Sequence, residues 1–179
     1  GAFTQYIDDV YENAVRDAIA LSRSTDGGLT WSVPARVNHD PSVPAFEPAV
    51  AVRGDGTIGV TYYDFRSNTP DPATLPTDYW ITRSTDAVSW RESRVAGPFD
   101  LATAPFSEGL FLGDYQALIA IGDLFVPFYA TTNGADLGNR SDVLDSLVSS
   151  AGTAARIERI GETEALTHAP TALPLTTTP

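Results

Sequence analysis

Short segments in which apolar and polar residues alternate, separated by turn residues, recur along most of the chain. Four of them follow one another in the middle of the sequence: residues 48–53, 57–65, 78–84 and 89–95. This alternation is typical of half-buried β-strands. The Asp55-Gly56 pair between the first two is a strong signal for a tight hairpin. The pattern therefore predicts a four-stranded antiparallel unit over residues 45–96.

The same order of segments begins before this unit. Residues 14–24 and 31–38 predict a strand and its return strand, which together give a partial unit over residues 1–40. Residues 11–21 also fit a short amphipathic helix, with Val15, Ala18 and Ile19 on one face. The turn motif directly after residue 24 favours the strand.

The order of segments resumes after the middle unit. Residues 113–121 and 124–131 predict two strands joined at Gly122-Asp123, and residues 142–149 predict either a third strand or the start of a helix. These segments give a further unit over residues 105–150. Residues 151–179 are rich in Thr, Ala and Pro, and we expect them to form a tail or linker.

The turn after the first predicted strand has the form Ser-x-Asp-x-Gly-x-Thr-Trp, residues 24–31. The Asp26 carboxylate is placed to accept backbone N–H groups across the turn. Gly27 and Gly28 permit the positive φ of a short hairpin loop. Thr30 and Trp31 re-enter a strand, and we expect the indole to cover the turn.

A second copy of this turn occupies residues 84–90. It keeps the Ser, Asp, Ser/Thr and Trp, lacks both glycines and is one residue shorter, and an arginine precedes both copies. Repetition in the same place relative to neighbouring strands indicates a repeat architecture. We expect Trp31 and Trp90 to be largely buried, and Asp86 to accept fewer backbone bonds than Asp26.

The motif resembles the Asp-box of the sialidase-like, or BNR-repeat, β-propellers. The residues that carry the resemblance are Ser24, Asp26, Gly28, Thr30, Trp31, Ser84, Asp86, Ser89 and Trp90. It implies an all-β Asp-box β-propeller, of which this chain supplies about two and a half blades. A closed ring needs about four to eight blades. We therefore expect a piece of a larger, six-bladed ring, cut inside a blade, or a ring completed by partner chains.

Composition narrows the function classes. The net charge is −12, from 23 acidic and 11 basic residues, which opposes binding to nucleic acid. The absence of cysteine excludes disulfides and Cys nucleophiles. The longest apolar runs are too short to span a membrane. The chain begins with Gly1 and contains no Met, as a processed piece would, and with the family resemblance this predicts a secreted or cell-surface location.

The resemblance also implies candidate chemistry. Sialidases of this family grip a substrate carboxylate with arginines and use a Tyr–Glu pair as nucleophile, with an Asp as acid/base. Tyr115 stands at the head of a predicted inner strand, as the family's tyrosine does, with Glu108 or Glu47 as its partner. The alternative is that Tyr115 only packs between inner strands.

Arg66 and Asp64, after the second strand of the middle unit, are the candidate substrate-binding residues. Arg66 has the geometry to bind a carboxylate in bidentate fashion, or to form an ion pair with Asp64 or Asp78. The family's arginine triad cannot be assembled from this sequence, and the Phe-Arg-Ile-Pro signature of its enzymes is absent. Whether the chain is an exo-sialidase-like glycoside hydrolase is thus an open question.

Metal chemistry has little support. Asp64, Asp71 and Asp78 are oxygen ligands of the kind that Ca²⁺ prefers, but their spacing is not that of an EF-hand. His39 and His168 lie in polar segments and predict no metal site. We expect no cofactor, with Ca²⁺ as the alternative.

Three functions remain open. The first is exo-sialidase-type glycoside hydrolysis by the full-length parent, and the second is binding of a glycan or glycoconjugate without catalysis. The third is a structural or protein-binding propeller subunit completed by partner chains. Fold alone does not choose among them.

Overall fold

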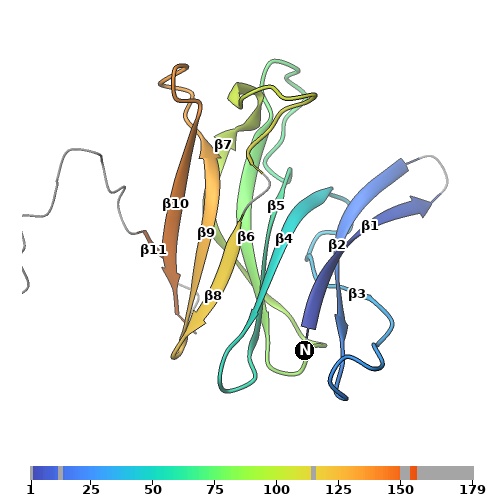
Figure 1. Cartoon of the computed structure of the whole chain (residues 1–179). Coiled ribbons are helices and arrows are strands. Elements are labelled where there is room, and N and C mark those ends of the chain that lie inside the picture. Colours follow the sequence, from blue (N-terminus) through green and yellow to red (C-terminus); the bar gives the residue numbers. More distant parts are fainter. Residues whose placement is uncertain (1, 12–13, 114–115, 150–153, 157–179) are drawn as a thin grey trace, which may run out of the picture.

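The computed structural model describes residues 2–11, 14–113, 116–149 and 154–156. They form three antiparallel sheets and one short 3₁₀ helix, η1 (Leu101–Thr103). The middle sheet has the order β4-β5-β6-β7, with strands Ala45–Val52, Ile58–Asp64, Pro76–Ser84 and Arg91–Asp100. All four strands predicted from the alternating pattern are confirmed, and the last continues to Asp100 (Figure 1).

The first sheet has the order β1-β2-β3, with strands Ala2–Tyr11, Ala14–Arg23 and Ala35–Arg36. The observed strand β2 confirms the strand predicted for residues 14–24, and the described residues within 11–21 do not form the alternative helix. The return strand is only two residues long, shorter than predicted for residues 31–38. Pro34 directly before it has no N–H to donate to a ladder, which accounts for the short pairing.

The third sheet has the order β11-β10-β9-β8. Its strands are β8 (Ala117–Ile121), β9 (Leu124–Thr132), β10 (Ser141–Val148) and β11 (Ala154–Arg156). The strand β10 decides against a helix over residues 142–149. Each sheet is an antiparallel meander, in which strands that follow one another along the chain are paired.

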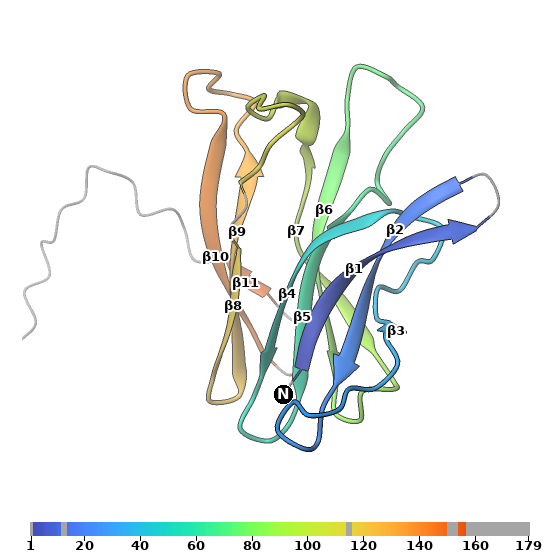
Figure 2. The same ribbon diagram turned by 45° about the vertical axis from the view of Figure 1, so that its right-hand side comes forward.

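The three sheets are stacked face to face, with the middle sheet between the other two (Figures 1 and 2). Alternation along β5 sends Val60 and Tyr62 into a core shared with Ile19 and Leu21 of the first sheet. Its other face packs on the third sheet, where Gly59 lies under the ring of Phe125. A Cβ on Gly59 would stand 2.7 Å from that ring. Burial on both faces explains why all of β5 is buried.

Aromatic stacking and a cross-sheet hydrogen-bond pair join the middle and third sheets. The Tyr79 ring stacks on Tyr129 with centroids 4.4 Å apart, and it contacts the tilted ring of Tyr63 with centroids 4.5 Å apart. The Tyr63 hydroxyl donates to the Ala130 carbonyl at 2.8 Å and accepts its N–H at 3.0 Å. Burial raises the pKa of Tyr63 and of Tyr79, so both stay neutral phenols.

The two ends of the stack differ. The turns after β2, β4, β6 and β8 gather at one end, which we call the turn end (Figure 1). The loops after β5, β7 and β9 gather at the opposite end, which we call the loop end (Figure 1). The repeated Ser-x-Asp turns lie at the turn end, and Arg66 begins a loop at the loop end.

Candidate functional site

The turn after β2 is held by side chains of its own sequence. Ser24 Oγ donates to Asp26 Oδ1 at 2.7 Å and accepts the Gly28 N–H at 2.7 Å. Asp26 also accepts the Thr30 N–H at 3.0 Å and the Thr30 hydroxyl at 2.6 Å. The Thr30 hydroxyl, followed by the Thr30 backbone N–H, holds the pKa of Asp26 well below its usual range. The indole N–H of Trp31 closes the turn onto the Gly28 carbonyl at 3.1 Å.

The turn after β6 has a related network. Ser84 Oγ donates to Asp86 Oδ1 and accepts the Ala87 N–H, both at 2.8 Å. Asp86 Oδ1 accepts the N–H groups of Val88 and Ser89 at 2.8 Å each. The expectation that Asp86 would accept fewer backbone bonds is therefore wrong. Ala87 adopts φ 59°, the left-handed conformation for which glycine is usual, and this keeps the shorter turn able to wrap the carboxylate.

The two tryptophans differ in burial. Trp90 is partly buried and packs against the core between the first and middle sheets. Trp31 is 44% exposed, so the prediction that it would be largely buried is wrong. Its indole lies across Gly28 of its own turn, and covering a turn at the turn end leaves its outer face in solvent.

The arginine that precedes each turn bonds to the next sheet. Arg23 Nη1 donates to the Asp86 carbonyl at 3.3 Å, and Arg83 Nη1 donates to the Ser149 carbonyl at 2.6 Å. Asp86 lies just after β6 of the middle sheet, and Ser149 lies just after β10 of the third sheet. Each arginine therefore contacts the next sheet of the stack at the corresponding place. The repeated Arg-Ser-Thr-Asp sequence was the signal for this sheet-to-sheet link.

At the loop end, Arg66 sits between two carboxylates. Its Nε donates to Asp64 Oδ2 at 2.7 Å, and its Nη1 pairs with Glu92 Oε2 of β7 at 2.5 Å. The guanidinium carbon lies 3.7 Å from the centre of the Trp80 ring. Trp80 in turn donates its indole N–H to Asp64 Oδ1 at 3.0 Å. Of the two predicted alternatives for Arg66, the ion pair with Asp64 is the one present.

Both carboxylates of this cluster are withdrawn from water. The side chains of Asp64 and Glu92 are 2% and 9% exposed. Burial raises the pKa of Asp64 in spite of the hydrogen bond from Arg66, and burial raises the pKa of Glu92 against a hydrogen bond from the His39 backbone. Sequence reasoning missed Glu92, because its contact with Arg66 depends on how β7 lies beside β6.

The acidic residues considered for Ca²⁺ are otherwise engaged. Asp64 and Asp78 are register partners on β5 and β6, but Asp78 pairs with Arg94 at 3.2 Å. Asp71 is exposed and accepts the Ala73 N–H at 2.9 Å. Among the residues that the structure describes, no three acidic or histidine side chains lie close enough together to hold a metal ion.

Of the candidate catalytic residues, the structure describes Glu108 and Glu47. Glu108 is exposed at the tip of a small hairpin that the Phe106–Leu110 bridge closes, with φ 56°. Glu47 is half-buried at an irregularity in the pairing of β4, with φ 49°. Tyr115 lies outside the described residues, so its relation to either glutamate stays a prediction.

In the part of the chain that the structure describes, no helix is long and apolar enough to cross a membrane. No protein-family model and no curated protein matches the sequence.

Proposed function

We propose that this chain is part of a larger Asp-box β-propeller that binds glycans and does not cleave them. The fold side of the proposal is supported by two Ser-x-Asp turns that hold their aspartates in related hydrogen-bond networks. Both turns occur at the same end of consecutive, face-to-face sheets. The same resemblance and the net charge of −12 support a secreted or cell-surface location.

The observation that favours binding over catalysis is the engagement of Arg66. A sialidase arginine must offer its guanidinium to the substrate carboxylate. Here Nε and Nη1 of Arg66 already face the carboxylates of Asp64 and Glu92, and Trp80 covers one face of the guanidinium. Freeing it would leave both buried carboxylates unpaired, which is costly.

The hairpin after η1 is the candidate glycan contact at the loop end. Phe106 is 79% exposed and Phe111 is 37% exposed, while the Phe111 N–H donates to the Pro105 carbonyl at 2.9 Å and fixes the hairpin. Glu108 at its tip holds a backbone conformation that non-glycine residues rarely adopt, a feature that concentrates at binding and active sites. Exposed aromatic rings beside a carboxylate suit the apolar faces and hydroxyl groups of sugars.

A titration of the chain with sialylated and neutral oligosaccharides tests the proposal. Phe106→Ala should weaken binding about fivefold or more, because it removes a stacking face. Leu137→Ala is the matched control, since Leu137 is 60% exposed on another loop of the loop end. Equal binding by the two variants, or no binding of any oligosaccharide, would contradict glycan recognition by this hairpin.

Exo-sialidase activity is the second candidate. It is favoured by the exposed Glu108 carboxylate, which stands seven positions before Tyr115 in the sequence. Turnover of a chromogenic sialoside that Tyr115→Phe abolishes would replace the binding proposal by catalysis, since the phenol oxygen has no substitute as nucleophile.

A structural role completed by further sheets is compatible with the binding proposal. The third sheet exposes apolar side chains on β8, β9 and β10, namely Ile119, Ile121, Phe128 and Val143. The rest of a propeller, or partner chains, would cover such positions.

A further inference from the structure

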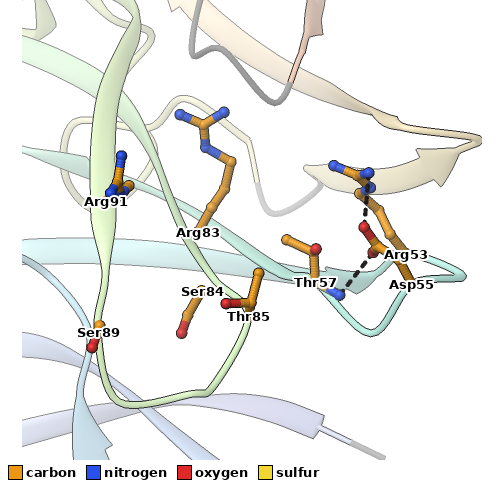
Figure 3. A pocket seen from close by; sticks show the side chains of 8 residues that line it. All are labelled: Arg53, Asp55, Thr57, Arg83, Ser84, Thr85, Ser89 and Arg91. Atoms are coloured by element: carbon orange, nitrogen blue, oxygen red, sulfur yellow. Dashed lines mark hydrogen bonds and ion pairs between the residues drawn. The ribbon is translucent and has the colours of Figure 1, made fainter.

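Three arginines line one cavity at the turn end of the middle sheet, on the face toward the third sheet. The cavity has a volume of about 410 Å³. Figure 3 shows its lining residues: Arg53, Asp55, Thr57, Arg83, Ser84, Thr85, Ser89 and Arg91. We call it the arginine pocket. It lies at the opposite end of the stack from Arg66 and the Phe106 hairpin.

The register of the strands explains why these arginines share a face. Arg83 of β6 is the direct partner of Gly59 on β5 and of Arg91 on β7. Ala51 of β4 is the partner of Gly59 on its other side, and Arg53 comes two residues later, so it points to the same face. The result is a row of cations that begins with Arg53, directly after β4, and continues with Arg83 on β6 and Arg91 on β7.

Among the residues that line the pocket, three arginines stand against one carboxylate. Arg53 Nη2 pairs with Asp55 at 2.9 Å, but the Asp55 side chain is 54% exposed. The Arg53 side chain is only 10% exposed, and its Nε has no hydrogen-bond partner among the described residues. Arg91 is exposed, and its side chain makes no hydrogen bond or ion pair with any described residue. Asp55 is the one carboxylate among the lining residues listed above.

Arg83 fixes a charge at the centre of the row. Its Nη1 donates to the Ser149 carbonyl at 2.6 Å and its Nη2 donates to Ser93 Oγ at 3.2 Å. Both acceptors are neutral, so these bonds orient the guanidinium without cancelling its charge. Burial lowers the pKa of Arg83, and the charges of Arg53 and Arg91 lower it further. Like charges directly across a strand pair destabilise a sheet.

Such a row is unexpected in a chain of net charge −12 with 11 basic residues in all. A bound anion would offset the repulsion among the three guanidiniums. One planar guanidinium can bind both oxygens of a planar carboxylate. Guanidiniums that approach from several directions instead match an anion whose oxygens point in several directions. The hydroxyl-bearing residues Thr85 and Ser89 add polar groups to the lining.

We propose that the arginine pocket binds a tetrahedral oxyanion, the sulfate or phosphate ester group of a larger ligand. The cavity volume exceeds that of one oxyanion, so part of the esterified sugar or alcohol enters with it. Arg91 and Arg53 contact the oxyanion, and Arg83 contributes its fixed charge. The site is independent of glycan binding at the loop end.

The test is a titration of the 179-residue chain, followed by the ¹⁵N–¹H signals of the arginine Nε–H groups at constant ionic strength. The probes are galactose 6-sulfate, galactose 6-phosphate and galacturonate, which present a sulfate ester, a phosphate ester and a carboxylate at the same end of one sugar. We expect saturable binding of at least one ester and weaker binding of galacturonate. Arg91→Ala should weaken it about tenfold or more, the value of one charge-assisted hydrogen bond.

Arg140→Ala is the matched control, because it removes the same charge from an exposed loop-end arginine, and it should change affinity less than about twofold. Arg91→Lys keeps the charge but loses the fork, and should bind with intermediate affinity. This variant also serves if Arg91→Ala does not fold. Equal loss in the Arg91 and Arg140 variants, tighter binding of galacturonate than of either ester, or no saturable binding would overturn the proposal.

Discussion

Replacing Arg66 by alanine removes the cation that bridges two buried carboxylates. The Arg66 side chain is 21% exposed, whereas the side chains of its partners Asp64 and Glu92 are 2% and 9% exposed. The change also uncovers the Trp80 ring, which lies 3.7 Å from the guanidinium carbon. We expect a large loss of stability without a change of fold, because the surrounding strands keep their ladders.

The size of the loss follows from these contacts. Hydrogen bonds to charged groups contribute about 1.5–3 kcal/mol each, and leaving a buried charge unpaired costs about 3–5 kcal/mol. Asp64 retains the indole N–H of Trp80 at 3.0 Å, and Arg66 is partly solvated. These two facts place the expected loss near the lower limit, at about 3 kcal/mol near neutral pH.

The loss should depend on pH in a stated direction. Burial raises the pKa of Asp64 and of Glu92 above their ordinary values of 3.8 and 4.5. The native state therefore binds protons more readily than the unfolded chain, and this part of the stability falls as pH rises through that region. Arg66→Ala raises both pKa values further, so the loss is smaller at about pH 4 than at about pH 7.5, because a protonated carboxyl does not need a cation beside it.

Urea unfolding of both proteins at the two pH values measures the effect. With a slope of about 2 kcal/mol/M, the midpoint should fall by about 1.5 M at pH 7.5 and by much less at pH 4. Arg140→Ala should leave the midpoint nearly unchanged, since Arg140 is exposed. A loss below about 1 kcal/mol at pH 7.5, or an equal loss at both pH values, would refute the account of Arg66 as a bridge between ionised buried carboxylates.

Three further changes test the turns and the sheet packing. The pKa of Asp26 is lowered chiefly by the Thr30 hydroxyl of its own turn, so its contribution to stability is present above its ordinary pKa and is lost progressively as pH falls below that value. The stability deficit of Asp26→Asn in urea unfolding should therefore shrink as pH falls below about 4, and a pH-independent deficit would contradict this. Gly59→Ala should lower stability by about 1–3 kcal/mol in thermal unfolding, because the new Cβ meets Phe125 at 2.7 Å, whereas Gly54→Ala, with open space around it, should have little effect. Ala87→Gly should raise the free energy of unfolding by up to about 1 kcal/mol, because φ 59° strains alanine. A clear loss of stability would show that the packing of the Ala87 methyl group matters more than the strain.

Much of the fold is visible in the sequence because its signals are local. Alternation and the Asp55-Gly56 turn predicted the strands of the middle sheet, and the Ser-x-Asp pattern anticipated the aspartate hydrogen bonds within each turn. One local expectation was wrong because of a backbone conformation. The absence of glycine suggested a poorer turn around Asp86, but Ala87 adopts the left-handed conformation that the turn needs.

The candidate site was less accessible to sequence reasoning. The ion pair of Arg66 with Asp64 was one of the alternatives that the sequence left open, yet the contact that decides the availability of Arg66 is with Glu92, 26 positions away. The arginine pocket gave no sequence signal, since Arg53, Arg83 and Arg91 come together only through the register of four strands.

The sequence by itself determined the elements of this protein: the period of two, the turn residues and the side chains that satisfy each turn depend on neighbours within a few positions. Only the tertiary structure decided the partners of its charges. Which face of a strand a side chain occupies follows from alternation, but which distant side chain it meets there depends on strand register and on the stacking of sheets. The charge of Arg66 is consequently balanced by buried carboxylates, while the row of Arg53, Arg83 and Arg91 keeps an excess of positive charge.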